Sequence, residues 1–217
     1  MKYHLIAIMI GFAEATIQGL SVSHHQATVN FTEAHSMGHQ YVFIKATEGS
    51  TYTDPMFAAH FASATEADFL RGSTHVAQPS SSSGSTQAKF FLSNGGGWND
   101  DSITLPGVLD LGGECTGMGA QAMVDWIQAF GDEYEAATGR WPVLKADNNW
   151  WVQCTGNTKE FVSKTDLMIM HWAPSPGSVP GGWRFWTFWQ YAENGAWGGN
   201  SEVFNGDADA LKKMATG

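Results

Sequence analysis

Cysteine and charge are both scarce in this sequence. Only two of its 217 residues are cysteines, which excludes a fold built on several disulfides but allows a single bridge. Charged residues make up 15% of the chain. The 11 Lys and Arg stand against 21 Asp and Glu and form no cluster, which argues against nucleic acid or an anionic membrane as a partner. No apolar run reaches the roughly 18 residues of a membrane-spanning helix.

Aromatic residues, by contrast, are abundant, with 10 Trp and 13 Phe. This composition excludes disorder, which requires few aromatic residues and many charges. A chain of this length buries a substantial core and forms one domain or two small ones. The serine-rich residues 80–85 and the glycines at 95–97 are too short to link domains, so we expect one domain.

The first residues have the layout of a secretory signal peptide. Lys2 precedes an apolar stretch over residues 5–12, and the Ala-Glu-Ala that follows supplies small residues at the spacing of a cleavage site. A first core strand or helix is the alternative interpretation. We therefore predict a signal peptide over residues 1–15, a mature domain over residues 16–217, and secretion to the extracellular space.

Secretion has two consequences for the chemistry of the chain. An oxidising compartment makes a disulfide between Cys115 and Cys154 reasonable. It also makes the sequon at Asn30 usable for glycosylation, although most short sequons occur by chance.

Short apolar runs alternate with helical patterns along the mature chain. The runs are continuous, which is typical of strands covered on both faces. They lie at residues 41–44, 108–111, 141–144, 167–170 and 186–189. The clearest helix is expected over about 119–138, where apolar residues recur every three to four positions from Met123 to Tyr134 before Gly139. Weaker helices are expected near residues 55–68, 85–93 and 157–163. The alternation predicts an α/β fold, either an open sheet or a barrel.

The ends of the predicted strands carry polar side chains suited to chemistry. In an α/β barrel, residues at the carboxyl ends of the strands line the active site. The residues at such positions are Ser21, Ser23, Lys45, Glu48, His75, Asp110, Glu114, Lys145, Asp147, His171, Trp172 and Gln190. Aromatic residues near the same strand ends suit a groove that stacks on sugar rings, or they fill the core.

Two other kinds of site lack their sequence signals. A Ser-His-Asp hydrolase would carry a Gly-x-Ser-x-Gly turn, and the sequence has none. The candidate ligands for a metal site are His24, His25, His75 and Asp110. They lack the usual ligand spacings, and adjacent histidines on a strand point to opposite faces. We therefore predict no metal site.

Several motifs, in order and with matching spacing, resemble one known family. They occupy residues 18–26, 43–49, 52–57, 71–75, 105–111 and 203–206. Over nearly the whole mature chain, the sequence resembles the fungal lysozymes of glycoside hydrolase family 25, the Chalaropsis-type N,O-diacetylmuramidases. The resemblance implies a single-domain, flattened β/α barrel of the TIM-like glycosidase type. It also implies a groove for peptidoglycan glycan strands, cleavage of the β-1,4 bond after N-acetylmuramic acid, no cofactor, and a Cys115–Cys154 disulfide.

The sequence departs from the family pattern at the acidic positions of that groove. The family's Asp-Val-Ser strand end begins here with Ser21. Its catalytic Asp-Leu-Glu, in which the Glu donates the proton, reads Asp110-Leu-Gly112. Asn200 replaces an acidic residue near the C-terminus. Of four acidic groove positions, Asp110 survives.

Other groove positions implied by the resemblance have also changed. Thr74 stands where the family usually has Tyr. A Tyr-Thr-Asn-like strand end begins with Lys145 and ends with Asp147. An Arg-Tyr pair has become His171 and Trp172.

These departures predict a muramidase-like protein that has lost its catalytic acids and binds peptidoglycan or another amino-sugar glycan. Gly112 has no side chain, and loss of a positioned general acid costs about 10²–10⁴ in rate. An alternative is a weak muramidase that uses Asp110 with Glu114. On an extended strand, positions 112 and 114 share a face about 6.5–7 Å apart. A third hypothesis is a secreted effector or decoy that acts through contacts with a protein partner.

Overall fold

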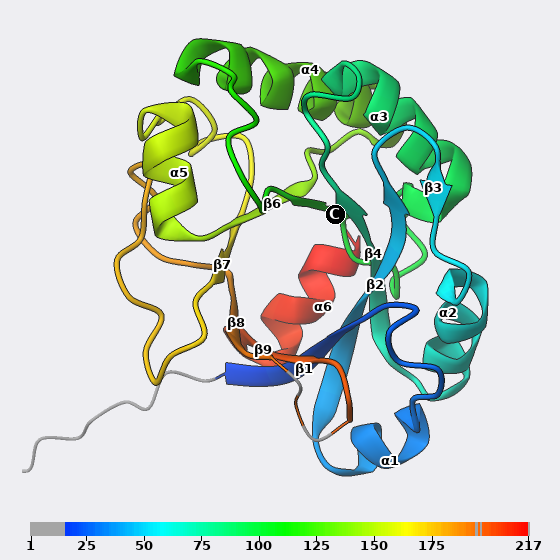
Figure 1. Cartoon of the computed structure of the whole chain (residues 1–217). Coiled ribbons are helices and arrows are strands. Elements are labelled where there is room, and N and C mark those ends of the chain that lie inside the picture. Colours follow the sequence, from blue (N-terminus) through cyan, green and yellow to red (C-terminus); the bar gives the residue numbers. More distant parts are fainter. Residues whose placement is uncertain (1–15, 194, 196, 217) are drawn as a thin grey trace, which may run out of the picture.

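In a computed structural model, which describes residues 16–193, 195 and 197–216, eight strands close into a barrel (Figure 1). The barrel strands are β1 (Thr16–Val22), β2 (His39–Glu48), β4 (Leu70–Val76), β5 (Val108–Asp110), β6 (Val143–Ala146), β7 (Leu167–Met170), β8 (Phe188–Ala192) and β9 (Asn200–Asn205). A short strand, β3 (Tyr52–Thr53), forms a hairpin with β2. The signal peptide predicted over residues 1–15 lies outside the described residues.

The strand order confirms the predicted barrel and shows where it departs from a regular β/α repeat. Strands β1, β2, β4, β5, β6, β7 and β8 run parallel to their neighbours in that order. Strand β9 closes the barrel between β8 and β1 and is antiparallel to both. The carboxyl ends of seven strands therefore meet at one mouth, together with the amino end of β9.

Helices cover part of the barrel wall. They are α1 (Phe31–Ser36), α2 (Phe57–Glu66), α3 (Gly84–Phe91), α4 (Ala120–Thr138), α5 (Asn148–Thr155) and α6 (Ala208–Thr216), with a π-helical turn η1 (Leu92–Gly96) after α3. Within the described part of the chain, the connections from β7 to β8 and from β8 to β9 contain no helix. Helix α6 is visible through the mouth of the barrel in Figure 1.

The interior of the barrel is apolar in the half opposite the mouth. Because side chains alternate across a strand, every second residue of each strand points inward. The inward-facing apolar cluster consists of Tyr41, Phe43, Leu105, Val108, Val143, Met168, Phe188 and Phe204, together with Leu211 and Ala215 of α6. Helix α6 thus closes the amino-terminal end of the barrel. The opposite end remains open for the site.

Helix α4 forms where its apolar stripe predicts it. Met123, Ile127, Phe130 and Tyr134 are fully buried, and they pack in the cluster between the sheet and helices α3 to α5. The helix ends at Gly139, whose φ of 81° is a left-handed conformation that favours glycine. The other helices predicted near residues 55–68 and 85–93 correspond to α2 and α3.

The helix predicted near residues 157–163 is wrong, because the helix lies earlier, at α5, and residues 160–164 form turns. Asp147 starts α5 by accepting a hydrogen bond from the backbone N–H of Trp150 at 2.8 Å. Gly156 and Asn157 then adopt left-handed φ values of 66° and 61°, which end the helix. Capping by Asp147 outweighs the weak helical preference of the tryptophans that follow.

Strand β4 shows no continuous apolar run in the sequence, and one of its inward positions, residue 72, must be small. A Cβ atom at Gly72 would lie 2.6 Å from the ring of Phe43. On the outward side, the guanidinium of Arg71 donates to the hydroxyl of Thr104 at 2.6 Å. Packing against neighbouring strands, rather than local preference, therefore defines this strand.

The predicted disulfide between Cys115 and Cys154 is confirmed. It joins the loop that follows β5 to the last turn of α5, and the two cysteines are 39 positions apart along the chain. The bridge anchors the loop that begins at the carboxyl end of β5, at the mouth of the barrel.

Candidate functional site

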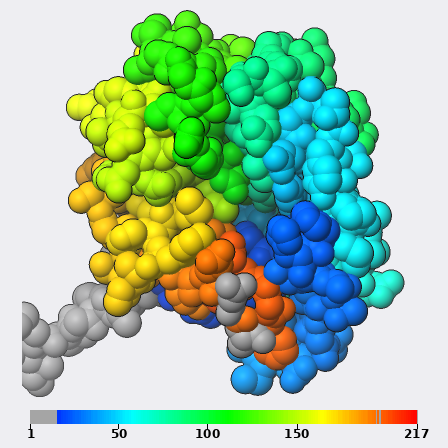
Figure 2. Space-filling model, viewed as in Figure 1, coloured from blue at the N-terminus to red at the C-terminus, as the bar shows by residue number. Residues whose placement is uncertain are grey.

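Four connected cavities cross the mouth of the barrel, which is hollowed between the green, blue and orange segments in Figure 2. The central cavity, of about 570 Å³, is lined in part by Ser21, Thr74, Asp110, Lys145, Glu193 and Asn200. It shares Asp110 with a loop cavity of about 350 Å³, which in turn shares Met170 with a β7 cavity of about 450 Å³. On the other side it shares His25 and Lys45 with a histidine cavity of about 690 Å³. The cavities form one continuous groove.

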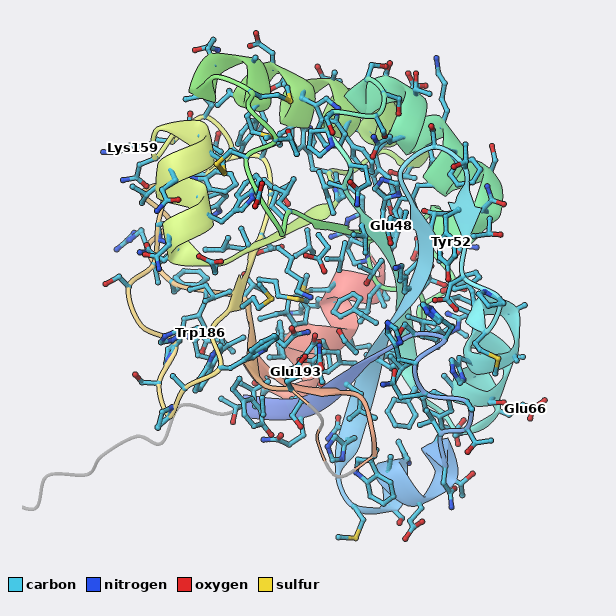
Figure 3. All side chains as sticks on the ribbon, viewed as in Figure 1. Glu48, Tyr52, Glu66, Lys159, Trp186 and Glu193 are labelled. Carbon is cyan, nitrogen blue, oxygen red and sulfur yellow. A yellow bond between two sulfur atoms is a disulfide. The ribbon has the colours of Figure 1, made fainter. Side chains whose placement is uncertain are left out.

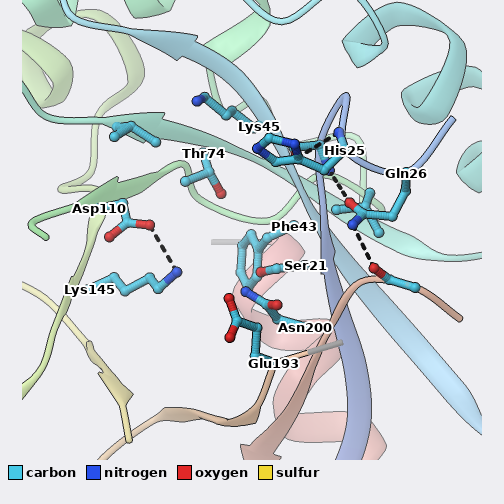
Figure 4. Close-up of a pocket in the computed structure, with 14 residues that line it drawn as sticks. Ser21, His25, Gln26, Phe43, Lys45, Thr74, Asp110, Lys145, Glu193 and Asn200 are labelled. Atoms are coloured by element: carbon cyan, nitrogen blue, oxygen red, sulfur yellow. Dashed lines mark hydrogen bonds and ion pairs between the residues drawn. The ribbon is translucent and has the colours of Figure 1, made fainter. Parts of the chain in front are cut away.

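Asp110 and Lys145 form an ion pair on one wall of the central cavity. They occupy paired positions on the parallel strands β5 and β6, so both side chains face the interior. The Lys145 Nζ atom lies 2.9 Å from Asp110 Oδ2 (Figure 4). Lys145 is 6% exposed, so solvent screens this pair only weakly. The Asp110 carboxylate therefore has a cation bound to it.

Gly112 stands directly beside this pair. Strand β5 ends at Asp110, and a Cβ atom built on Gly112 would lie 3.7 Å from Asp110 Oδ1 with no other heavy atom within 4 Å outside its chain neighbours. The position therefore has room for a side chain next to the carboxylate but does not have one.

Glu114 lies on the same loop but not in the geometry of an extended strand. Gly113 has a left-handed φ of 76°, so the chain turns between residues 112 and 114. The spacing given above for an extended strand therefore does not apply to these two positions. Glu114 is exposed and lines the loop cavity together with Asp110 and Gly112.

A buried carboxyl group lies beneath the central cavity, at Glu202 of β9. This fully buried side chain accepts hydrogen bonds from the Ser21 hydroxyl and, at 2.8 Å, from the Gln190 amide. Its second oxygen has no partner among the described residues. Burial raises the pKa of Glu202, although the positive charge of Lys145 opposes the shift. The protonated carboxyl is thus favoured relative to an exposed glutamate.

Glu202 was not predicted as a site residue. It directly precedes the Val-Phe-Asn-Gly motif at residues 203–206 and is not part of it. The available signal was the alternation along β9, in which Asn200, Glu202 and Phe204 occupy one face. A charged residue between two inward-facing positions is unusual enough to mark a polar layer in a barrel.

The remaining residues of the central cavity come from other strands. Thr74 of β4, Ser21 of β1 and Asn200 of β9 all contribute to its lining, as the resemblance implies. Glu193, which sequence reasoning missed, follows β8 and also lines this cavity (Figure 4). Glu193 lies outside the family motifs, so the sequence indicates a place in the groove only through its position directly after a strand.

His75, predicted as a groove residue, lies inside the protein. Its imidazole is fully buried, with Nδ1 2.7 Å from the Thr47 hydroxyl and Nε2 3.0 Å from the Gln87 side-chain oxygen. Burial lowers the pKa of His75 to about 4, so the ring is neutral near pH 7. Gln190, also predicted in the groove, is fully buried as a partner of Glu202.

The β7 cavity brings together three other predicted residues. His171 and Trp172 follow β7, and Asp147 follows β6. The Trp172 side chain is 51% exposed, which leaves a large aromatic face available at the cavity. Asp147 also caps α5, so its carboxylate has a structural role as well.

The histidine cavity contains the imidazole of His24, which already has hydrogen-bond partners. His24 Nδ1 lies 2.7 Å from Asp54 Oδ2, and the Tyr52 hydroxyl lies 3.1 Å from the same nitrogen. The His24 and His25 rings lie 4.1 Å apart in a turn, not on opposite faces of a strand. Among the described residues, no group of three His, Cys, Asp or Glu is arranged to hold a metal ion.

Comparison with known proteins gives consistent matches over most of the chain. The profile of the family described as glycosyl hydrolases family 25 matches residues 20–200. The N,O-diacetylmuramidase of Chalaropsis sp is 46% identical over 211 residues, covering 93% of this chain and 100% of that relative. In the part of the chain that the structure describes, no helix has the length and apolar character needed to cross a membrane.

Solved structures match equally well. A family GH25 lysozyme from Aspergillus fumigatus superposes with a TM-score of 0.91 at 48% identity, covering 94% of this chain and 100% of that chain. A muramidase from Trichobolus zukalii also gives a TM-score of 0.91, at 46% identity, with 92% and 99% of the two chains covered.

Proposed function

The chain belongs to glycosyl hydrolases family 25, and from that membership we propose that its groove binds the glycan strands of peptidoglycan while hydrolysis is strongly impaired. One observation carries the proposal. Position 112 has space for a side chain beside Asp110, yet it is a glycine and supplies no acid. The position at which the resemblance places the proton donor therefore has no side chain that could supply a proton.

The electrostatics of the groove support impaired hydrolysis. Cleavage of a glycosidic bond needs a carboxylic acid at the leaving oxygen and a carboxylate that stabilises positive charge at the anomeric carbon. Here the Asp110 carboxylate is paired with Lys145, and Ser21 and Asn200 are neutral. A cation close to the developing positive charge opposes the transition state.

The shape of the groove supports binding of an extended glycan. Its four cavities connect through shared residues, so a linear ligand can cross the whole mouth of the barrel. The exposed face of Trp172 provides a platform for an apolar sugar face. Asn148 and Asn149 line the same cavity and supply amides for hydroxyl or N-acetyl groups.

Secretion is part of the same proposal. The Cys115–Cys154 disulfide is stable in an oxidising compartment, and peptidoglycan lies outside the bacterial membrane. An extracellular protein would therefore meet this ligand directly.

The test combines retention on insoluble peptidoglycan with a restored acid. We expect the protein to be retained, and the triple variant Gly112→Glu, Ser21→Asp, Asn200→Asp to release reducing ends at least about 100-fold faster, because it regains a general acid. The matched control carries Gly112→Gln with the same two aspartates, which restores side-chain volume but no proton. Release of sugars by the unmodified protein at the rate of the triple variant would contradict impaired hydrolysis, and absence of retention would contradict binding.

A further inference from the structure

Glu193 brings a second carboxylate to the central cavity. It follows β8 directly, its side chain is exposed, and it lines the same cavity as Asp110. In Figure 4 its carboxylate lies on the side of Ser21 and Asn200, while Asp110 and Lys145 lie on the β5 and β6 side. Among the described residues, no hydrogen bond or ion pair engages the Glu193 carboxylate, so it remains available to a ligand in the groove.

We infer that Glu193 is the general acid of a slow residual hydrolysis, with Asp110 on the other side of the cavity as its partner. The inference rests on the proposed binding of a glycan in this groove. Two carboxyl groups on different walls of one cavity can flank a scissile bond, which is the arrangement that glycoside hydrolysis requires. The acid has then moved from the end of β5 to the end of β8.

The other carboxyl groups near the mouth suit this role less well. Glu202 is fully buried and is held by Ser21 and Gln190, so it cannot contact a ligand. Glu114 belongs to the loop cavity and follows the same strand as Asp110, which places both groups at one strand end. Glu193 instead follows β8, which lies three strands away from β5 around the barrel.

The chemical step balances with water as the co-reactant. The proton of the Glu193 carboxyl passes to the glycosidic oxygen, and the bond from that oxygen to the anomeric carbon breaks with its electron pair left on the oxygen. A water oxygen bonds to the anomeric carbon, and the proton that it loses passes to the Asp110 carboxylate. One water is consumed, and a proton returns from Asp110 to Glu193 through solvent.

Lys145 makes this step slow rather than absent. Its ammonium lies 2.9 Å from Asp110 Oδ2 and so places positive charge beside the position where the oxocarbenium-like charge develops. The second oxygen of Asp110 has no hydrogen bond from another described side chain, and it remains able to meet a water molecule.

The test measures new reducing ends on purified peptidoglycan, labelled with borodeuteride and counted by mass spectrometry. We expect slow turnover by the unmodified protein and a loss of about 100-fold or more in Glu193→Gln, with partial retention in Glu193→Asp. Retention on insoluble peptidoglycan is measured in parallel, so that a loss of turnover in Glu193→Gln can be separated from a loss of binding. Glu66→Gln serves as the control, because Glu66 is exposed on α2 far from the groove (Figure 3) and should leave turnover unchanged.

Three outcomes would overturn the inference. Turnover that persists in Glu193→Gln but disappears in Glu114→Gln would assign the acid to the loop cavity. Retention of the protein on peptidoglycan without any turnover would leave the proposed binding intact and remove the role of Glu193. Absence of both retention and turnover would refute the proposed function together with the inference.

Discussion

At the residue scale, the carboxyl groups of the barrel mouth lie in very different environments. Gly112 and Ser21 have no carboxylate, whereas Glu202 holds one in the interior and Glu193 holds one at the edge of the groove. A buried carboxyl group differs from an exposed one because burial disfavours its charged form. Glu202 should therefore influence the stability of the protein as a function of pH.

We expect Glu202 to make the protein less stable as the pH rises. Its folded pKa is raised above the unfolded value, so the folded state holds more protons between the two values. The free energy of unfolding then falls as the pH increases from about 4.5 through the folded pKa. Glu202→Gln keeps an acceptor for Ser21 and removes this titration, so its stability relative to the unmodified protein should be greater at pH 7 than at pH 4.

Urea unfolding at pH 4 and pH 7 measures this difference. The exposed Glu66→Gln provides the reference for a substitution of the same chemistry outside the barrel. An equal effect of Glu202→Gln at both pH values would show that the buried carboxyl does not titrate between them on unfolding.

At the scale of elements, helices α3 and α4 pack closely because the first residue of α3, Gly84, has no side chain. A Cβ atom on Gly84 would lie 2.1 Å from the carbonyl oxygen of Trp126 and 2.8 Å from the backbone nitrogen of Phe130. Both contacts are with backbone, which cannot move as a side-chain end does. Helix α4 in turn carries the stripe that covers the sheet, so this contact fixes how the helix lies on the barrel.

Gly84→Ala should therefore destabilise the protein by about 1–3 kcal/mol, as overpacking of a tight contact does. Gly97→Ala is the matched control, because its added Cβ atom would meet only the end of Leu92 at 3.9 Å and its φ of −70° suits alanine. Denaturant midpoints of the two variants give the comparison. Equal midpoints would mean that α3 shifts away from α4 without cost.

The elements that could be predicted from the sequence are those with a local signal. Helix α4 has an apolar stripe and a terminal glycine, and the runs at residues 41–44 and 167–170 are continuous because neighbouring layers cover both faces. Strand β4 and the start of α5 could not be predicted in the same way. The first depends on a small residue at Gly72 that fits the Phe43 ring, and the second on a cap that outweighs the residues that follow it.

At the scale of the whole molecule, the barrel divides into two layers with different roles. The lower layer is apolar and is closed by α6, whose Leu211 and Ala215 pack in the interior cluster. The upper layer holds the polar residues Ser21, Asp110, Lys145 and others at the mouth. The family motifs predicted which residues reach this layer, but the burial of His75 and the ion pair of Lys145 depend on packing between distant strands.

Leu211→Ala should cost about 2–5 kcal/mol, because it opens a cavity in the closed end of the barrel. Lys212→Ala, at an exposed position of the same helix, should change stability by less than about 0.5 kcal/mol. Calorimetry on both variants measures the difference. Retention on peptidoglycan should be the same for both at temperatures where they are folded, since α6 does not line the groove.

The closure of the barrel by α6 also determines what a selection experiment on this protein can detect. Because the apolar layer and α6 lie at the end opposite the groove, libraries randomised at exposed positions of the mouth should pass a screen for expression or solubility whether or not they bind anything. Yield would therefore be uninformative about recognition. The same separation means that exposed residues of the groove can be changed to alter carbohydrate specificity without changing the apolar core that stabilises the fold.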